Sequence, residues 1–196
     1  MLKKILTIFL LISSFQVASE GVTDKELEQF AKNWNLLMPE NAYDFIPEKL
    51  NYKLLTSPDF QAKIAQANKQ TNPALEGEII ELAGFMVPIE TKGTKVTKFL
   101  LVPEAGQCIH VPPPPLNQTL LINSENHPTK LRDIYEPIVV SGRLSVGAQS
   151  FDLSNSNIAD PNQDAMGSVS YDTVESGYSL TQTTVKTLVF EQSKDD

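Results

Sequence analysis

Cys108 and His110 are the two residues of this chain best suited to chemistry, because thiolates and imidazoles are common ligands of transition metals. If the chain is extended here, alternate side chains share a face, so Cys108 and His110 lie together and Ile109 and Val111 point the other way. A sulfur beside a ring nitrogen is half of a site for zinc or copper(I). The chain has no second cysteine, and His127, the only other histidine, is a weaker candidate ligand.

The sequence leaves the role of Cys108 open. As the only cysteine it cannot form an internal disulfide, so it is a buried structural residue, a metal ligand, a reactive thiol or a link to another chain. Glu104, Asp133 and Glu136 are candidate oxygen ligands, although their spacing does not single them out. No base with an orienting partner marks a catalytic thiol. The motifs of zinc proteases, phosphate-binding loops and serine hydrolases are also missing. We therefore assign no catalytic residue and favour a protein that is not an enzyme.

Four consecutive prolines follow Val111 and form the second unusual feature of this segment. Such a run adopts a stiff polyproline helix without internal hydrogen bonds. It can present a preordered apolar ridge to a partner, or it can pack as a wall against the protein's own aromatic residues. The amides that come next can bond the carbonyl groups that prolines leave free. The predicted partner-binding surface consists of Pro112, Pro113, Pro114, Pro115, Asn117 and Gln118.

The first 19 residues have the pattern of a secretory signal peptide. Lys3 and Lys4 precede an apolar run over residues 5–13, and Val17 and Ser19 are small enough for the positions before a cleavage site. We expect cleavage after Ser19. The apolar run is shorter than the roughly 20 residues of a membrane-spanning helix. We therefore expect a periplasmic or secreted protein with no membrane insertion after signal cleavage.

The chain is acidic, with a formal net charge of −8. The predicted signal peptide carries two lysines and no acidic residue, so its removal makes the charge of the mature chain more negative, at −10. A surface of this charge repels nucleic acids and anionic membranes. We therefore expect no nucleic-acid partner.

Residues 20–75 are predicted to form a helical N-terminal extension. Thr23 and Glu26 fit a capping box at the start of a first helix, which Pro39 ends. A second helix begins at Pro58, with Ser57 before it, and stops near Pro73. The apolar stripe of the first helix is Leu27, Phe30, Ala31, Trp34 and Met38, and that of the second is Phe60, Ile64 and Ala67.

Residues 76–196 are predicted to form a β domain. Gly84 and Gly142 interrupt two of its strands and indicate bulges or bends. Residues 147–180, rich in Ser, Asn, Asp and Gly, are expected to form a long surface excursion with one hairpin near 168–180. The fold class is therefore mainly β with N-terminal helices (α+β), as a small OB-like or related β-barrel. The expected strands cover residues 78–88, 98–103, 108–111, 119–123, 137–146 and 184–191.

Four stretches of the chain resemble a bacterial exported family of unknown function. They are GFMVP at 84–88, FLLVP at 99–103, the CxHxPPPPxNQ segment at 108–118 and PIVVSGRL at 137–144. The proline segment is the most specific of them, and the similarity covers about residues 76–146. The resemblance implies a small β domain and an accessory role near exporter-type transporters or zinc-responsive genes. Family members are periplasmic or lipid-anchored, and this chain lacks the lipid-anchor cysteine.

Three functions remain open at this point. The first is a periplasmic accessory protein that binds zinc or copper in support of an envelope transporter. The second is a non-catalytic module that docks an ABC-type transporter or another envelope protein through the proline ridge. The third is a thiol enzyme that uses Cys108 with His110 or His127.

Overall fold

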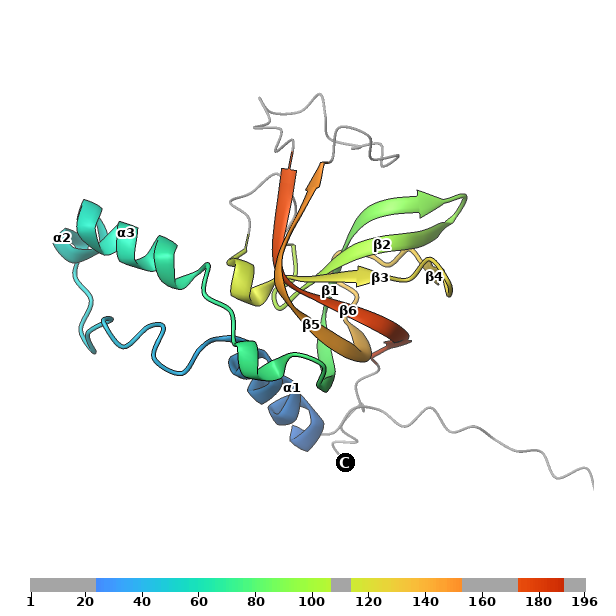
Figure 1. The fold of residues 1–196 in the computed structure, drawn as a ribbon, viewed down its shortest axis with the longest axis horizontal. Coiled ribbons are helices and arrows are strands. Elements are labelled where there is room, and N and C mark those ends of the chain that lie inside the picture. The colour runs from blue at the N-terminus through green and yellow to red at the C-terminus, as the bar shows by residue number, and fades with distance from the viewer. Residues whose placement is uncertain (1–23, 107–113, 153–172, 189–196) are drawn as a thin grey trace, which may run out of the picture.

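The computed structural model describes residues 24–106, 114–152 and 173–188, and these form a mainly β protein with helices at its N-terminal side (Figure 1). This confirms the predicted class. The helices are α1 (Asp24–Leu37), α2 (Tyr52–Leu55) and α3 (Pro58–Ala67), with single 3₁₀ turns η1 (Pro73–Leu75) and η2 (Leu116–Gln118). The strands are β1 (Ile79–Lys92), β2 (Lys95–Val102), β3 (Leu120–Asn123), β4 (Thr129–Lys130), β5 (Ile138–Asp152) and β6 (Thr173–Thr187).

Five of these strands form a closed ring of pairings. The sheet order is β1-β5-β6-β3-β2, β2 also pairs with β1, and β4 is added at the edge of β2. Strands β3 and β6 run parallel, and the other pairs are antiparallel. The ring closes because β1 is long enough to pair with two different strands. Its residues 79–84 pair with β5 and its residues 85–92 pair with β2.

Gly84 marks the point at which β1 changes partner. A Cβ atom at this position would lie 2.5 Å from the carbonyl oxygen of Val102, so only glycine permits the close approach of the two strands. The predicted bend at Gly84 therefore corresponds to the change of partner. The register shifts between β1 and β2 fall later, on either side of Glu90.

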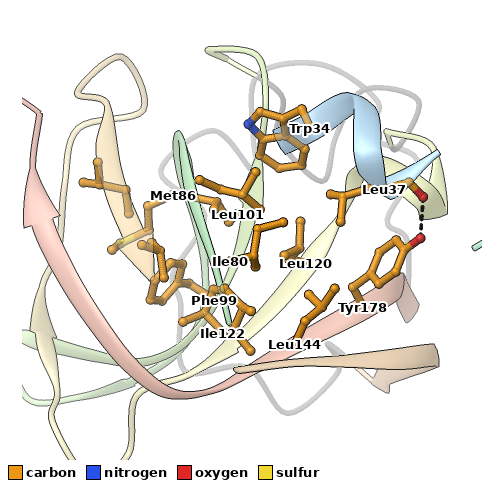
Figure 2. Close-up of a cluster of buried hydrophobic side chains, with 14 of the residues drawn as sticks. Trp34, Leu37, Ile80, Met86, Phe99, Leu101, Leu120, Ile122, Leu144 and Tyr178 are labelled. Carbon is orange, nitrogen blue, oxygen red and sulfur yellow. Dashed lines mark hydrogen bonds between the residues drawn. The ribbon is translucent and has the colours of Figure 1, made fainter. Parts of the chain in front are cut away.

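Alternating side chains of the ring supply two apolar clusters. Met86 and Leu101 belong to the main core, whereas their neighbours Val87 and Leu100 belong to a second cluster, so the two clusters lie on opposite faces of the sheet. The main core also takes in Trp34 and Leu37 of α1 (Figure 2). The N-terminal helix is thus part of the same core as the strands.

Helix α1 covers the stretch of β1 that β2 does not pair with. The indole nitrogen of Trp34 donates a hydrogen bond to the carbonyl oxygen of Ala83 (2.7 Å), and the side-chain amide of Asn33 donates to that of Glu81 (2.6 Å). These side chains satisfy β1 carbonyl groups in the place of a neighbouring strand.

The sequence predicted the position of α1 well and its apolar stripe only in part. Phe30 and Trp34 are buried as expected, but Leu27 and Ala31 are exposed and Leu37 is fully buried. The helix ends two residues before Pro39, as predicted.

Helix α3 begins as its sequence indicates. The Ser57 hydroxyl accepts a hydrogen bond from the backbone amide of Phe60 (3.2 Å), and Pro58 occupies the first helical position. Phe60 and Ala67 are buried, and the Phe60 ring meets Phe45 edge to face with centroids 5.7 Å apart.

The prediction of a surface excursion over residues 147–180 is wrong for its two ends. Residues 147–152 extend β5, and residues 173–180 begin β6. These polar residues form strand because they pair with each other from Asp152 and Thr173 onward. Tyr178 and Leu180 of this stretch are fully buried in the main core. The strand predicted at 108–111 lies outside the described residues.

Candidate functional site

Four of the predicted site residues, Cys108, His110, Pro112 and Pro113, lie outside the described residues. The chain is described up to Gly106 and again from Pro114. Gly106 follows the end of β2 at Val102, and η2 leads into the start of β3. The two flanks of the segment therefore lie toward the same end of the β2–β3 pair, where Leu101 pairs with Leu120.

The C-terminal flank of the proline segment is firmly attached to the fold. The carbonyl oxygen of Pro115 accepts hydrogen bonds from the backbone amide of Gln118 (2.8 Å) and from the hydroxyl of Thr119 (2.9 Å). The side-chain amide of Gln118 lies 3.2 Å from the sulfur of Met38. The expected satisfaction of proline carbonyls thus occurs at Pro115, through the backbone of Gln118 and the side chain of Thr119.

Asn117 is a buried polar hub rather than a surface residue. Its side chain is 0% exposed, and its amide nitrogen donates to the carbonyl oxygen of Ala67 and lies 3.1 Å from the hydroxyl of Tyr43. Its backbone amide donates to the carbonyl oxygen of Asn68 (3.2 Å). Asn117 therefore ties the proline flank to the end of α3 and to the loop before α2.

The N-terminal flank lies beside the loop of residues 131–137. A Cβ atom at Gly106 would lie 3.7 Å from the ring of Tyr135 in this loop. Two of the candidate oxygen ligands are found here. Glu136 is paired with Arg132 (3.0 Å), and a carboxylate oxygen of Asp133 accepts a hydrogen bond from the amide of Tyr135 (2.9 Å). The structure thus brings this loop toward the start of the Cys108 segment, with both carboxylates already engaged.

His127 lies in a different part of the molecule, beyond the opposite end of β3. It lines a groove of about 580 Å³ between the turn after β3 and the C-terminal half of β6. The turn is held by Ser124, whose buried hydroxyl lies within hydrogen-bonding distance of the carbonyl oxygens of Val96 and Thr97 (3.2 and 3.1 Å). The lining residues are Asn123, Ser124, Asn126, His127, Pro128, Thr129, Gln182, Thr183, Thr184 and Val185.

The far wall of the groove contains a β-bulge centred on Gln182. The register between β5 and β6 shifts between Ser141 and Arg143, so that Gln182 and Thr183 on β6 together stand opposite the single residue Gly142 on β5. Gln182 has φ = 54° and, among the residues that the structure describes, is the one non-glycine residue in the left-handed region. Gly142 lies across from the bulge, and a Cβ atom there would lie 2.8 Å from the carbonyl oxygen of Thr181. Apart from the glycine at position 142, no local feature of the sequence predicted this groove.

No group of three potential metal-ligating residues occurs within the described ranges 24–106, 114–152 and 173–188.

The one clear pKa shift in this part of the chain belongs to Tyr178. Burial raises the pKa of its hydroxyl above 10.0, and the hydrogen bond from the backbone of Asn72 counteracts this in part. Tyr178 is a core residue, so this shift does not identify a catalytic group.

Within the described residues, no helix combines the length and apolar character needed to cross a membrane.

The chain belongs to the DUF3299 family, described as proteins of unknown function, whose profile matches residues 34–187. It is similar to the crystal structure of a DUF3299 family protein from Pseudomonas aeruginosa PAO1. The two share 26% sequence identity with a TM-score of 0.53 over 81% of this chain and 95% of the other. No curated protein matches the sequence significantly. These findings agree with the resemblance to a family of unknown function and cover the strands and most of the helices.

Proposed function

We propose that this chain is a non-catalytic accessory protein of the bacterial envelope, in which an OB-like β-barrel presents its proline segment to a membrane transporter or another envelope protein. The predicted signal peptide supports the compartment. The ring of five strands, with β3 and β6 as its one parallel pair, supports the OB-like arrangement.

The observation that carries the proposal is the rigid attachment of the proline flank. Pro114 and Pro115 remain partly exposed, while the hydrogen bonds of Pro115, Asn117 and Thr119 fix the chain that follows them. A polyproline run is stiff by itself, and a fixed base leaves it little freedom to lose on binding. Such preorganisation favours docking, because ordering a flexible segment opposes association.

A crosslinking experiment in the envelope tests this proposal. The tagged full chain is compared with a Pro113→Ala/Pro114→Ala variant and with Pro47→Ala, which changes an exposed proline in another loop. We expect a crosslinked transporter or envelope protein with the full chain and with Pro47→Ala, and its loss with the double variant. Equal recovery of the same protein by all three chains, at equal thermal stability, would reject the proline segment as the docking surface.

Metal binding is a second candidate, favoured by the spacing of Cys108 and His110. Zinc and copper(I) are the metals that suit a thiolate and an imidazole. Metal analysis of the purified chain after zinc or copper loading is expected to give about one ion per chain. A Cys108→Ala/His110→Ala variant should lose the ion, whereas His127→Ala should keep it because His127 lines the separate groove. A wild-type chain that holds no metal after loading would exclude this function.

A further inference from the structure

The groove around His127 is separate from the proline segment and has the features of a small-molecule site. The groove is open to solvent, and its volume of about 580 Å³ lies within the range of clefts that bind small molecules. The mouth of a small barrel is also a common location for such sites. The wall formed by the turn after β3 is held in place by hydrogen bonds. The Ser124 hydroxyl lies within hydrogen-bonding distance of the carbonyl oxygen of Val96 in β2, and the backbone amide of His127 donates to the carbonyl oxygen of Ser124 (3.0 Å).

The free hydrogen-bonding groups of the groove include two side-chain amides and an imidazole. The side chains of Asn126, His127 and Gln182 line it and have no hydrogen-bond partner among the described residues. Each can both donate and accept a hydrogen bond. The lining contains no carboxylate, ammonium or guanidinium group, so it has no permanently charged side chain to pair with an ionic ligand.

The backbone at Gln182 adds a second observation. A glutamine in the left-handed region is strained by about 1 kcal/mol, and glycine would relieve this strain. Bulges at the rims of barrels re-aim side chains, and backbone strain tends to gather at functional sites. The strained residue here is one that lines the groove.

We propose that this groove binds a neutral saccharide. Sugars combine hydroxyl groups, which both donate and accept hydrogen bonds, with apolar C–H faces. The amides and imidazole match the hydroxyl groups, and Pro128 and Val185 offer apolar surface for the ring faces. An uncharged, hydroxyl-rich ligand fits this set of residues better than an anion or a cation. The inference concerns residues other than those of the proposed docking segment, so either can fail without the other.

Nuclear magnetic resonance titration of the ¹⁵N-labelled full chain tests the proposal with two neutral saccharides, triacetylchitotriose and maltotriose. We expect saturable shifts at residues 123–129 and 182–185 with a Kd on the order of 1 mM for at least one of them. The Pro113→Ala/Pro114→Ala variant should bind equally well. Binding of one saccharide alone would define the class as N-acetylated or plain.

Gln182→Gly is the most informative variant, because glycine keeps the left-handed backbone and removes only the side chain with its amide. We expect its stability to equal or exceed that of the wild type and its Kd to rise at least about fivefold. Gln70→Gly, the same change in an exposed loop, should leave the Kd unchanged.

Three results would overturn the proposal. One is the absence of shifts at the groove with either saccharide up to about 20 mM. Another is an equal Kd for the wild type and Gln182→Gly. The last is binding of the uncharged capped peptide N-acetyl-trialanine amide at the groove without binding of a saccharide.

Discussion

At the scale of single residues, Tyr178 connects the β-ring to the N-terminal helices. Its side chain is fully buried, and its hydroxyl donates to the carbonyl oxygen of Leu37 (Figure 2). The same hydroxyl accepts a hydrogen bond from the backbone amide of Asn72 (2.6 Å). Tyr178→Phe removes both bonds and leaves two polar groups without a partner. We expect a loss of about 1–3 kcal/mol in the free energy of unfolding at pH 7, measured with urea. Tyr52→Phe, at a side chain that is 82% exposed, should have little effect.

The raised pKa of Tyr178 also gives this contribution a pH dependence. The unfolded chain releases the phenolic proton near pH 10, whereas the folded chain releases it only at higher pH. The stabilisation is therefore complete below pH 10 and declines as the pH rises from there through the pKa of the folded state. We expect the stability difference between the wild type and Tyr178→Phe to shrink as the pH rises above about 10. A constant difference over this range would contradict the assignment.

Asn117 allows a structural role to be separated from a partner-binding role. Asn117→Ala should lower the free energy of unfolding by about 1–3 kcal/mol, because the carbonyl oxygen of Ala67 and the hydroxyl of Tyr43 lose a buried partner. Asn35→Ala, at an exposed position of α1, should change it by less than about 0.5 kcal/mol. Chemical denaturation of the three chains measures both effects. An Asn117→Ala chain with wild-type stability would mean that the residue is not the hub described above.

At the scale of elements, the edge of the ring carries three lysines in register. Lys95 of β2 lies opposite Lys92 of β1 on one side and opposite Lys130 of β4 on the other, and all three are exposed. Like charges directly opposite each other in a sheet are unfavourable. Lysines on an edge strand do, however, discourage pairing with other chains.

Lys95→Glu should therefore stabilise the fold. It replaces two repulsive pairs with two attractive ones, and we expect a gain of about 0.2–1 kcal/mol per pair at low salt. The gain should shrink in 1 M NaCl, because salt screens exposed charges. Lys95→Gln, which only removes the repulsion, should give a smaller gain. A stability of Lys95→Glu at or below the wild-type value at low salt would refute the repulsion.

Local sequence signals predicted the elements that begin with a capping residue and a proline or with an apolar run. The cap and proline at Ser57 and Pro58 placed α3, and the apolar run after residue 78 placed the start of β1. The first half of β6 was predicted only as part of a local hairpin near 168–180 in a surface excursion, because its residues are Ser, Thr, Gly and Glu as often as apolar. It forms strand through pairing with β5, which is a long-range contact. The groove was missed for the same reason, since Gln182 has no local mark of a bulge.

At the scale of the whole molecule, the sequence predicts a helical extension and a β domain, and in the structure helix α1 of the extension shares the main core with the strands. The pattern at residues 24–37 predicted a helix with an apolar face, but its partner surface depends on how β1 is shared between β5 and β2. That closure is a property of strands distant in sequence. Trp34 and Leu37 complete the main core, and Trp34 also caps an open β1 carbonyl group.

The dependence of the ring on α1 leads to a prediction about a shortened chain. Residues 76–196 alone lack Trp34 and Leu37, leave Tyr178 without both hydrogen-bond partners and expose the uncovered edge of β1. Free strand edges and exposed apolar faces promote association. We expect this chain to unfold without a cooperative transition or to aggregate, whereas residues 24–196 should unfold cooperatively and remain monodisperse. Circular dichroism melting and size-exclusion chromatography measure the two properties. A cooperative melt of residues 76–196 within a few degrees of the longer chain would show that the strands form an independent unit and that α1 is only an appendage.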